Sequence, residues 1–203
     1  MLLANKKVFV TGATRGIGRS IAEAFREQGA RVIGTGTVEA NNSFSWCDEY
    51  FQADFSDLKQ IRACADFIRK TEPDVLVNNA GINKIAPFAE IDPADFLRIQ
   101  QVNVVAPLYF CQAAIPGMKR RGWGRIVGLS SIWGKISKEY RASYSASKFA
   151  LDGLTLALAV EHGADGILAN CIAPGFIDTE LTRRVVGDEQ IQRLLSIVPA
   201  RRM

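Results

Sequence analysis

Short apolar runs alternate with longer amphipathic stretches along the 203-residue chain. This alternation is typical of a parallel β-sheet covered by helices, because buried strands are apolar throughout whereas covering helices are apolar on one side. The pattern predicts an α/β fold of three α/β/α layers around a doubly wound parallel sheet. Strands are predicted at residues 7–10, 31–34, 50–52, 75–77, 125–129 and 168–172. Helices are predicted at residues 17–28, 58–70, 93–118, 144–162 and 188–196.

No repeat, low-complexity segment or linker divides the chain, so residues 1–203 are expected to form a single domain. This length suits one domain with a full hydrophobic core. Residues 38–49, between the second and third predicted strands, are polar and irregular. A crossover helix there is expected to be short or absent.

A glycine-rich turn, Thr11-Gly-Ala-Thr-Arg-Gly-Ile-Gly18, follows the first predicted strand and precedes a predicted helix. Gly12 permits a tight turn, Gly16 lets the backbone approach a pyrophosphate, and Gly18 allows the helix to pack close to the strand. The free amides at the helix start would face the phosphates. A purely structural turn is the alternative. Its place between a strand and a helix favours dinucleotide binding in a Rossmann-type sheet.

Tyr144 and Lys148 lie four residues apart on a predicted helix and therefore share one face. An ammonium group in that position favours the ionised form of the phenol. Such a pair is frequent by chance, so its interpretation depends on the motifs that precede it.

Four motifs stand in an order that strongly resembles the short-chain dehydrogenase/reductase family. They are the glycine turn with the spacing Gly-x-x-x-Gly-x-Gly, Asn78-Asn-Ala-Gly81, Ser130-Ser131, and Tyr144 with Lys148. The resemblance runs from about Lys6 to Thr179 and is greatest to the 3-oxoacyl-carrier-protein reductases, in residues 34–37 and 174–179. It implies an NAD(P)-dependent oxidoreductase.

The resemblance implies a catalytic set of Asn103, Ser131, Tyr144 and Lys148. Ser131 is preferred to Ser130 because it stands thirteen positions before Tyr144. Tyr144 would protonate the carbonyl oxygen that Ser131 orients, while Lys148 would lower the pKa of the phenol and hold the nicotinamide ribose. Asn103 would hold a water of the proton relay, although a buried structural asparagine is the alternative.

NADP(H) is favoured over NAD(H) as the cofactor. The segment Gly34-Thr-Gly-Thr37 carries no carboxylate to repel a 2′-phosphate, and Arg15 can pair with that phosphate. The alternative is that Arg15 is only solvent-exposed and Glu39 supplies the acidic group. Asp54 is expected at the adenine, although it or Asp57 could instead cap a helix. The whole expected cofactor set is Gly12, Thr14, Arg15, Gly16, Ile17, Gly18, Thr37, Asp54, Phe55, Asn79, Ala80, Gly81, Tyr144, Lys148, Pro174, Gly175, Ile177 and Thr179.

Composition argues against several classes of partner. A net charge of +4 is too small to indicate nucleic acid. The four cysteines are widely spaced and His162 is the single histidine, so no metal site is expected. The amino terminus has no cleavable apolar segment, and no run approaches the length of a membrane span. A cytoplasmic protein without a membrane partner is therefore expected.

The leading functional hypothesis is an NADPH-dependent reductase of a 3-oxoacyl thioester or related ketone. Basic residues at 119–125 could attract an acidic acyl carrier protein, whereas Asp165 stands where such reductases often carry a basic docking residue. Alternatives are a reductase or dehydrogenase of a free sugar, polyol or other small alcohol or ketone, and a non-catalytic dinucleotide-binding regulatory protein. Relatives pair through the helices that hold Asn103 and Tyr144, which implies a homodimer or homotetramer.

Relatives continue beyond the position of Arg202 with one more helix and a last strand. The domain is therefore expected to be short at its carboxyl end, either as a truncated form of a longer protein or naturally. Its sixth strand would then be an exposed sheet edge. Residues 180–196 are predicted to form a mobile lid over the substrate.

Overall fold

The computed structural model describes residues 2–39, 44–180, 182–183, 191, 193, 195–196 and 198–203. Six parallel strands form one sheet in the order β3-β2-β1-β4-β5-β6. The strand order reverses between β1 and β4, as in a doubly wound sheet. The predicted fold is confirmed. The strands are β1 (Lys7–Val10), β2 (Arg31–Gly36), β3 (Glu49–Gln52), β4 (Val75–Asn78), β5 (Gly124–Leu129) and β6 (Ile167–Ile172).

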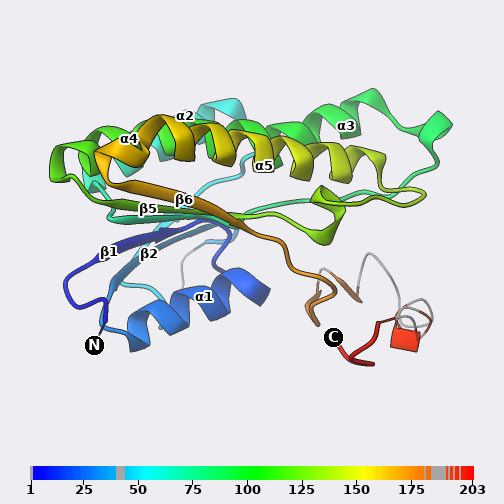
Figure 1. Cartoon of the computed structure of the whole chain (residues 1–203), viewed down its shortest axis with the longest axis horizontal. Helices are drawn as coiled ribbons and strands as arrows, with labels where there is room; N and C mark the ends of the chain where they lie inside the picture. Colours follow the sequence, from blue (N-terminus) through cyan, green and yellow to red (C-terminus); the bar gives the residue numbers. More distant parts are fainter. Residues whose placement is uncertain are drawn as a thin grey trace.

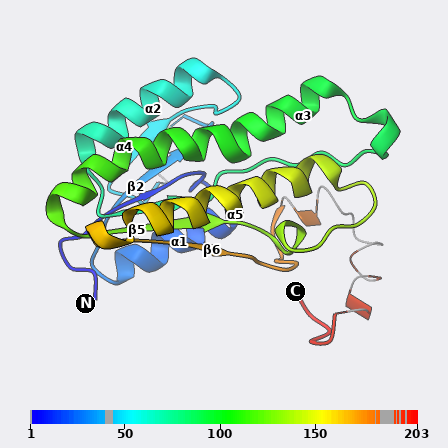
Figure 2. The same cartoon turned by 45° about the horizontal axis from the view of Figure 1, so that its top comes forward.

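Helices cover both faces of this sheet, which gives three layers. Figure 1 shows α1 (Gly16–Glu27) on one face and α2 (Leu58–Thr71), α4 (Ala106–Arg121) and α5 (Ala142–His162) on the other. Turned by 45°, the same view shows α3 (Pro93–Gln100) leading into α4 (Figure 2). Short 3₁₀ segments lie at η1 (Phe88–Glu90), η3 (Ile132–Gly134) and η4 (Gly163–Asp165).

The prediction of one continuous α-helix over residues 93–118 is wrong, because a π-helical segment, η2 (Gln101–Val105), separates α3 from α4. Pro107 follows within the first turn of α4 and has no amide hydrogen, so it cannot donate to the carbonyl of Asn103 in the regular α-helical pattern. Single π-helical turns inside α-helices are frequent at functional sites. Here the turn carries Asn103.

Alternate residues of the central strands pack into two hydrophobic cores, one on each face of the sheet. Phe9 belongs to the core under α2 and α4, whereas Val8 and Val10 belong to the core under α1. This follows from the two-residue period of a strand, and burial on both sides explains why β1 is continuously apolar.

An aromatic cluster takes the place of a helix between β2 and β3, where the described residues form none. Trp46 is 2% exposed and contacts the rings of Phe44 and Tyr50. A Cβ atom at Gly34 would lie 2.3 Å from the Trp46 ring, so a side chain there would displace it. The expected absence of a regular crossover helix is confirmed for this described part of the loop.

β6 is an edge strand of the described sheet, with Leu168 and Ile172 about half exposed. The predicted helix at residues 188–196 lies largely outside the described residues, as does most of the lid predicted at residues 180–196. None of the described helices is long and apolar enough to span a lipid bilayer.

Candidate active site

A cleft of about 300 Å³ opens at the carboxyl ends of the strands, where the strand order reverses. This is where open α/β sheets bind their ligands. Most of the predicted cofactor residues line this cleft: Gly12, Thr14, Arg15, Gly16, Ile17, Gly18, Thr37, Asp54, Phe55, Asn79, Ala80, Gly81, Tyr144, Lys148, Pro174 and Thr179. Gly175, Ile177 and Glu39 are not among its lining residues.

The glycine turn is packed too tightly for side chains. Gly12 has a φ of 65°, and a Cβ atom there would lie 2.9 Å from the Cα atom of Ala80. A Cβ atom at Gly18 would lie 2.2 Å from the carbonyl oxygen of Gly12. The helix α1 that follows has no acidic residue in its first turn and no side-chain cap. Its amino end is therefore open to an anionic group, and these features fit the pyrophosphate of a dinucleotide.

Asn79 holds the glycine turn against β4. Its side-chain amide donates to the carbonyl oxygens of Thr11 (2.9 Å) and Gly12 (3.0 Å). The Thr11 hydroxyl accepts in return from the backbone amides of Asn79 and Ala80, each at 3.0 Å. The predicted contact between Asn79 and the cofactor stays a prediction. The side-chain amide of Asn79 already donates hydrogen bonds to the glycine turn.

Two threonines at the strand ends support this turn and were not in the predicted set. Besides Thr11, Thr35 accepts a hydrogen bond from the Gly12 amide at 3.2 Å. Thr11 precedes Gly12 of the predicted set, and Thr35 precedes Gly36 in the segment from which the cofactor preference was predicted. A threonine before a glycine at a strand end is the sequence signal from which both could have been found.

The two aspartates after β3 have separate tasks. Asp57 is the amino-terminal cap of α2, where its side chain accepts from the Lys59 amide at 2.8 Å. Asp54 lines the cleft, and one of its oxygens accepts from the Ser56 amide at 2.8 Å. Capping of α2 therefore belongs to Asp57, and Asp54 faces the cleft. Phe55 is 5% exposed, and its ring packs in the core against Phe110.

Asn103 is 1% exposed and fully hydrogen-bonded within the chain. Its side-chain oxygen accepts from the Ile82 amide at 2.9 Å, and its amide nitrogen donates to the Ile82 carbonyl and the Ser147 hydroxyl, both at 3.0 Å. A Cβ atom at Gly81 would lie 3.4 Å from Asn103 Oδ1 and 3.6 Å from Lys148 Nζ. Asn103 thus flanks Lys148 but does not itself line the cleft.

Tyr144 lines the cleft with a largely buried phenol ring. Burial raises the pKa of this phenol above its ordinary value, while a hydrogen bond with Ser131 and the positive charge of Arg141 act in the opposite direction. Ser131 is 8% exposed and also accepts from the Trp133 amide at 3.2 Å. The structure therefore brings Ser131 to Tyr144, as the sequence predicted.

Lys148 is almost fully buried, and its ammonium group donates to the Leu129 carbonyl at 2.6 Å. Burial lowers the pKa of Lys148 to about 8, against the attraction of the Cys171 and Asp152 side chains. Its Nζ atom lies 5.4 Å from the centre of the Tyr144 ring. We expected Lys148 to lower the pKa of Tyr144. In the protein without a cofactor, the groups that act to lower this pKa are Ser131 and Arg141.

The cleft, its glycine turn and the adjoining Ser131, Tyr144 and Lys148 define a dinucleotide-dependent oxidoreductase. Within the described residues, no group of three or more histidine, cysteine, aspartate or glutamate side chains is placed to hold a metal ion. The hydroxyl of Ser131, the phenol of Tyr144 and the ammonium group of Lys148, which are groups able to transfer protons, adjoin the cleft.

The family model described as short chain dehydrogenase matches residues 6–190, and the chain belongs to this family. It is 35% identical to the 3-oxoacyl-[acyl-carrier-protein] reductase FabG of Escherichia coli K12, with 100% of this chain and 86% of that protein covered. It is 32% identical to D-beta-hydroxybutyrate dehydrogenase of Cupriavidus necator, over 91% of this chain and 76% of the relative.

Among solved structures, a candidate NAD(P)-dependent gluconate 5-dehydrogenase from Beutenbergia cavernae superimposes with a TM-score of 0.90 at 33% identity. The match covers 98% of this chain and 84% of that structure, which holds NADP at low occupancy. The protein is accordingly an NAD(P)-dependent oxidoreductase with the fold of short-chain dehydrogenases.

Proposed function

We propose that this protein is an NADP(H)-dependent reductase of a small carbonyl compound. The observation that carries the proposal is that Tyr144, hydrogen-bonded with Ser131 and next to buried Lys148, lies in the wall of the dinucleotide cleft. A protein that only bound a dinucleotide would not need a protonated phenol beside a serine at this place.

The chain's own residues supply the proton and orient the carbonyl. Bound NADPH would supply the hydride. Negative charge that develops on the carbonyl oxygen is stabilised by hydrogen bonds from Ser131 and Tyr144, and the Tyr144 phenol transfers its proton to that oxygen. Since burial keeps this phenol protonated at neutral pH, it is ready to act as the acid. Lys148 lies where it can return a proton towards Tyr144 and contact a ribose.

Arg15 supports the preference for NADP(H). It lines the cleft and lies 3.5 Å from Glu180, in a pair whose side chains are both more than half exposed. An exposed pair of this kind contributes roughly 0–1 kcal/mol, so a phosphate can replace Glu180 as the partner. Thr37 also lines the cleft, whereas Glu39, the alternative acidic residue, does not.

Replacing Arg15 with leucine is expected to lower kcat/KM for NADPH by about 10–100-fold and to leave NADH little changed. A charged hydrogen bond to a phosphate contributes roughly 1.5–3 kcal/mol, and only NADPH has the 2′-phosphate. Initial rates with both cofactors measure the effect. Arg19→Leu is the matched control, since Arg19 pairs with Glu23 on α1 and does not line the cleft. Equal losses with NADPH and NADH would contradict the role of Arg15.

The basic residues that could attract an acyl carrier protein are largely paired within the chain. Lys119 lies 2.9 Å from Asp165, and Arg120 and Arg121 both pair with Glu72. Arg125 donates to the carbonyls of Gly124 (2.7 Å) and Gly166 (3.3 Å).

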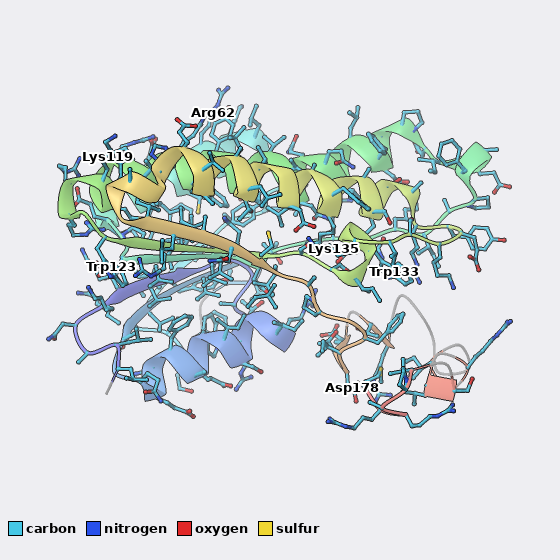
Figure 3. The ribbon with its side chains drawn as sticks, viewed as in Figure 1. Arg62, Lys119, Trp123, Trp133, Lys135 and Asp178 are labelled. Carbon is cyan, nitrogen blue, oxygen red and sulfur yellow. The ribbon has the colours of Figure 1, made fainter. Side chains whose placement is uncertain are left out.

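This cluster also lies at the amino end of β5, opposite the carboxyl ends of the strands that form the cleft. Figure 3 shows Lys119 and Trp123 on the left of the molecule and Trp133 and Lys135 right of its centre. Internal pairing and this position favour a free small molecule over a carrier-bound thioester as the substrate.

Oxidation of NADPH by the purified chain tests the proposed function. The carbonyl panel should contain 3-oxoacyl thioesters, free ketones, keto sugars and oxo acids. Turnover is expected with a free carbonyl compound and to be faster with NADPH than with NADH. NADPH binding without turnover of any member would favour the non-catalytic alternative.

Exposed apolar side chains on three helices fit the predicted assembly of at least two subunits. They are Leu97, Leu108, Phe149, Leu156 and Val160, each at least 39% exposed. Phe149, Leu156 and Val160 repeat at helical spacing along α5 and therefore form one stripe. A continuous exposed apolar stripe marks an interaction surface. The homodimer or homotetramer stays a prediction.

A further inference from the structure

A buried arginine stands at the beginning of α5 and has no hydrogen bond or ion pair with the residues that the structure describes. Arg141 is the amino-terminal cap residue of α5 and is only 6% exposed. Its backbone carbonyl accepts from the Ser145 amide at 2.8 Å. Its guanidinium group has no hydrogen bond, ion pair or ring contact with any described residue, although its charge interacts with those of Glu139 and Tyr144.

A buried charge without a partner is costly, and proteins usually pair such groups or place them at functional sites. The nearest acidic side chain along the chain, Glu139, interacts electrostatically with Arg141 but forms its ion pair with Lys138, at 3.5 Å. Five donor hydrogens of the Arg141 guanidinium are therefore available to a ligand.

The position of Arg141 places that charge beside the reacting centre. It is the cap residue of α5 and Tyr144 is the third residue of the helix, so the two stand three positions apart, the spacing of neighbours on a helix. The Arg141 charge acts on the Tyr144 phenol, as the direction of its effect on that pKa shows. In addition, α5 has no acidic residue in its first turn and no side-chain cap, so its amino end adds positive potential.

We propose that Arg141 binds a carboxylate of the substrate, so that the protein reduces a small oxo acid to a hydroxy acid. This inference rests on the proposed function and narrows its substrate class. The guanidinium fork matches a carboxylate, with which it forms two parallel hydrogen bonds. One buried cation balances the single charge of a carboxylate, whereas a doubly charged phosphate would leave a net charge in the site. A carrier-bound 3-oxoacyl thioester has no carboxylate near its ketone.

Calorimetric titration of the protein in the presence of NADP⁺ tests this carboxylate site without turnover, because a ketone cannot accept hydride from the oxidised cofactor. The probes are pyruvate, acetoacetate, 4-oxopentanoate and 5-oxohexanoate, each compared with its methyl ester. At least one acid is expected to bind roughly 10–100-fold more tightly than its ester, as for a charged hydrogen bond worth about 1.5–3 kcal/mol. Equal binding of every acid and its ester would overturn the proposal.

Arg141→Met should remove the difference between acid and ester and leave the affinity for the ester unchanged. Arg98→Met is the matched control, since Arg98 lines the cleft, which Arg141 does not, and is exposed. It should keep the preference for the acid. Loss of that preference in Arg98→Met and its retention in Arg141→Met would assign the carboxylate to Arg98 and overturn the proposal.

Thermal unfolding separates a binding role from a structural one. Because Arg141→Met removes a buried charge that has no ion pair with the described residues, its Tm is expected to equal or exceed that of the wild type. A lower Tm together with equal losses for acid and ester would show that Arg141 is structural. If the acids bind more tightly than their esters through Arg141 but NADPH reduces none of them, the carboxylate site is confirmed and the proposed reductase activity is contradicted.

Discussion

Tyr144→Phe is expected to lower kcat for carbonyl reduction by about 10²–10⁴-fold, the usual contribution of a positioned general acid. The substitution removes only the phenolic oxygen, which is the group that meets Ser131 and would donate the proton. The ring remains, and with it the packing beside Lys148, whose Nζ lies 5.4 Å from the ring centre. The affinity for NADPH should therefore change little. Steady-state rates and a separate titration of NADPH binding measure the two effects.

Tyr140→Phe provides the matched control for this experiment. Tyr140 stands four positions earlier in the same connection, is 55% exposed and does not line the cleft. Its loss of a hydroxyl should leave both kcat and NADPH binding unchanged. If Tyr144→Phe retained a rate similar to that of this control, Tyr144 would not be the proton donor.

Gly18→Ala is expected to weaken NADPH binding by roughly 10–100-fold and to lower the thermal stability. The new Cβ atom would lie 2.2 Å from the Gly12 carbonyl oxygen and 2.3 Å from Asn79 Nδ2. Both neighbours belong to the hydrogen-bonded turn, so the backbone that approaches the pyrophosphate must move. Overpacking of this kind costs about 1–3 kcal/mol. A domain of this size then loses roughly 2–4 °C in Tm per kcal/mol. Calorimetric titration of NADPH and thermal unfolding measure the two losses.

Gly163→Ala controls for the added methyl group. A Cβ atom at Gly163 meets nothing within 4 Å, and its φ of −58° suits any residue. NADPH affinity and Tm should stay close to those of the wild type. An unchanged affinity in Gly18→Ala would mean that the glycine turn does not hold the dinucleotide as proposed.

Local patterns predicted much of this protein because they depend on neighbours in the sequence. The apolar runs placed all six strands, and strand-turn-helix order placed Gly12 and Gly18 at the mouth of the cleft. The helical spacing of Tyr144 and Lys148 predicted that both would reach the same site, and both line it. These features follow from the periods of strands and helices and from the conformational freedom of glycine.

Pairing and burial were decided by tertiary structure, because the groups involved are far apart in the sequence. Asn103 bonds to Ile82 and Ser147 from a π-helical turn that helix periodicity did not predict. The Phe55 ring lies in the core, where it packs against Phe110.

Sequence by itself thus determined the positions of the strands along the chain, the glycine turn and the motifs of the family, since each of these is a local pattern. Only the tertiary structure decided which charges are satisfied, because the partner of each charge is set by packing. It paired Lys119 with Asp165 at 2.9 Å, and it buried Arg141 near Tyr144 without an ion pair to any described residue. Lys119 and Asp165 therefore belong to a neutralised surface, whereas Arg141 is a candidate site for the carboxylate of the substrate.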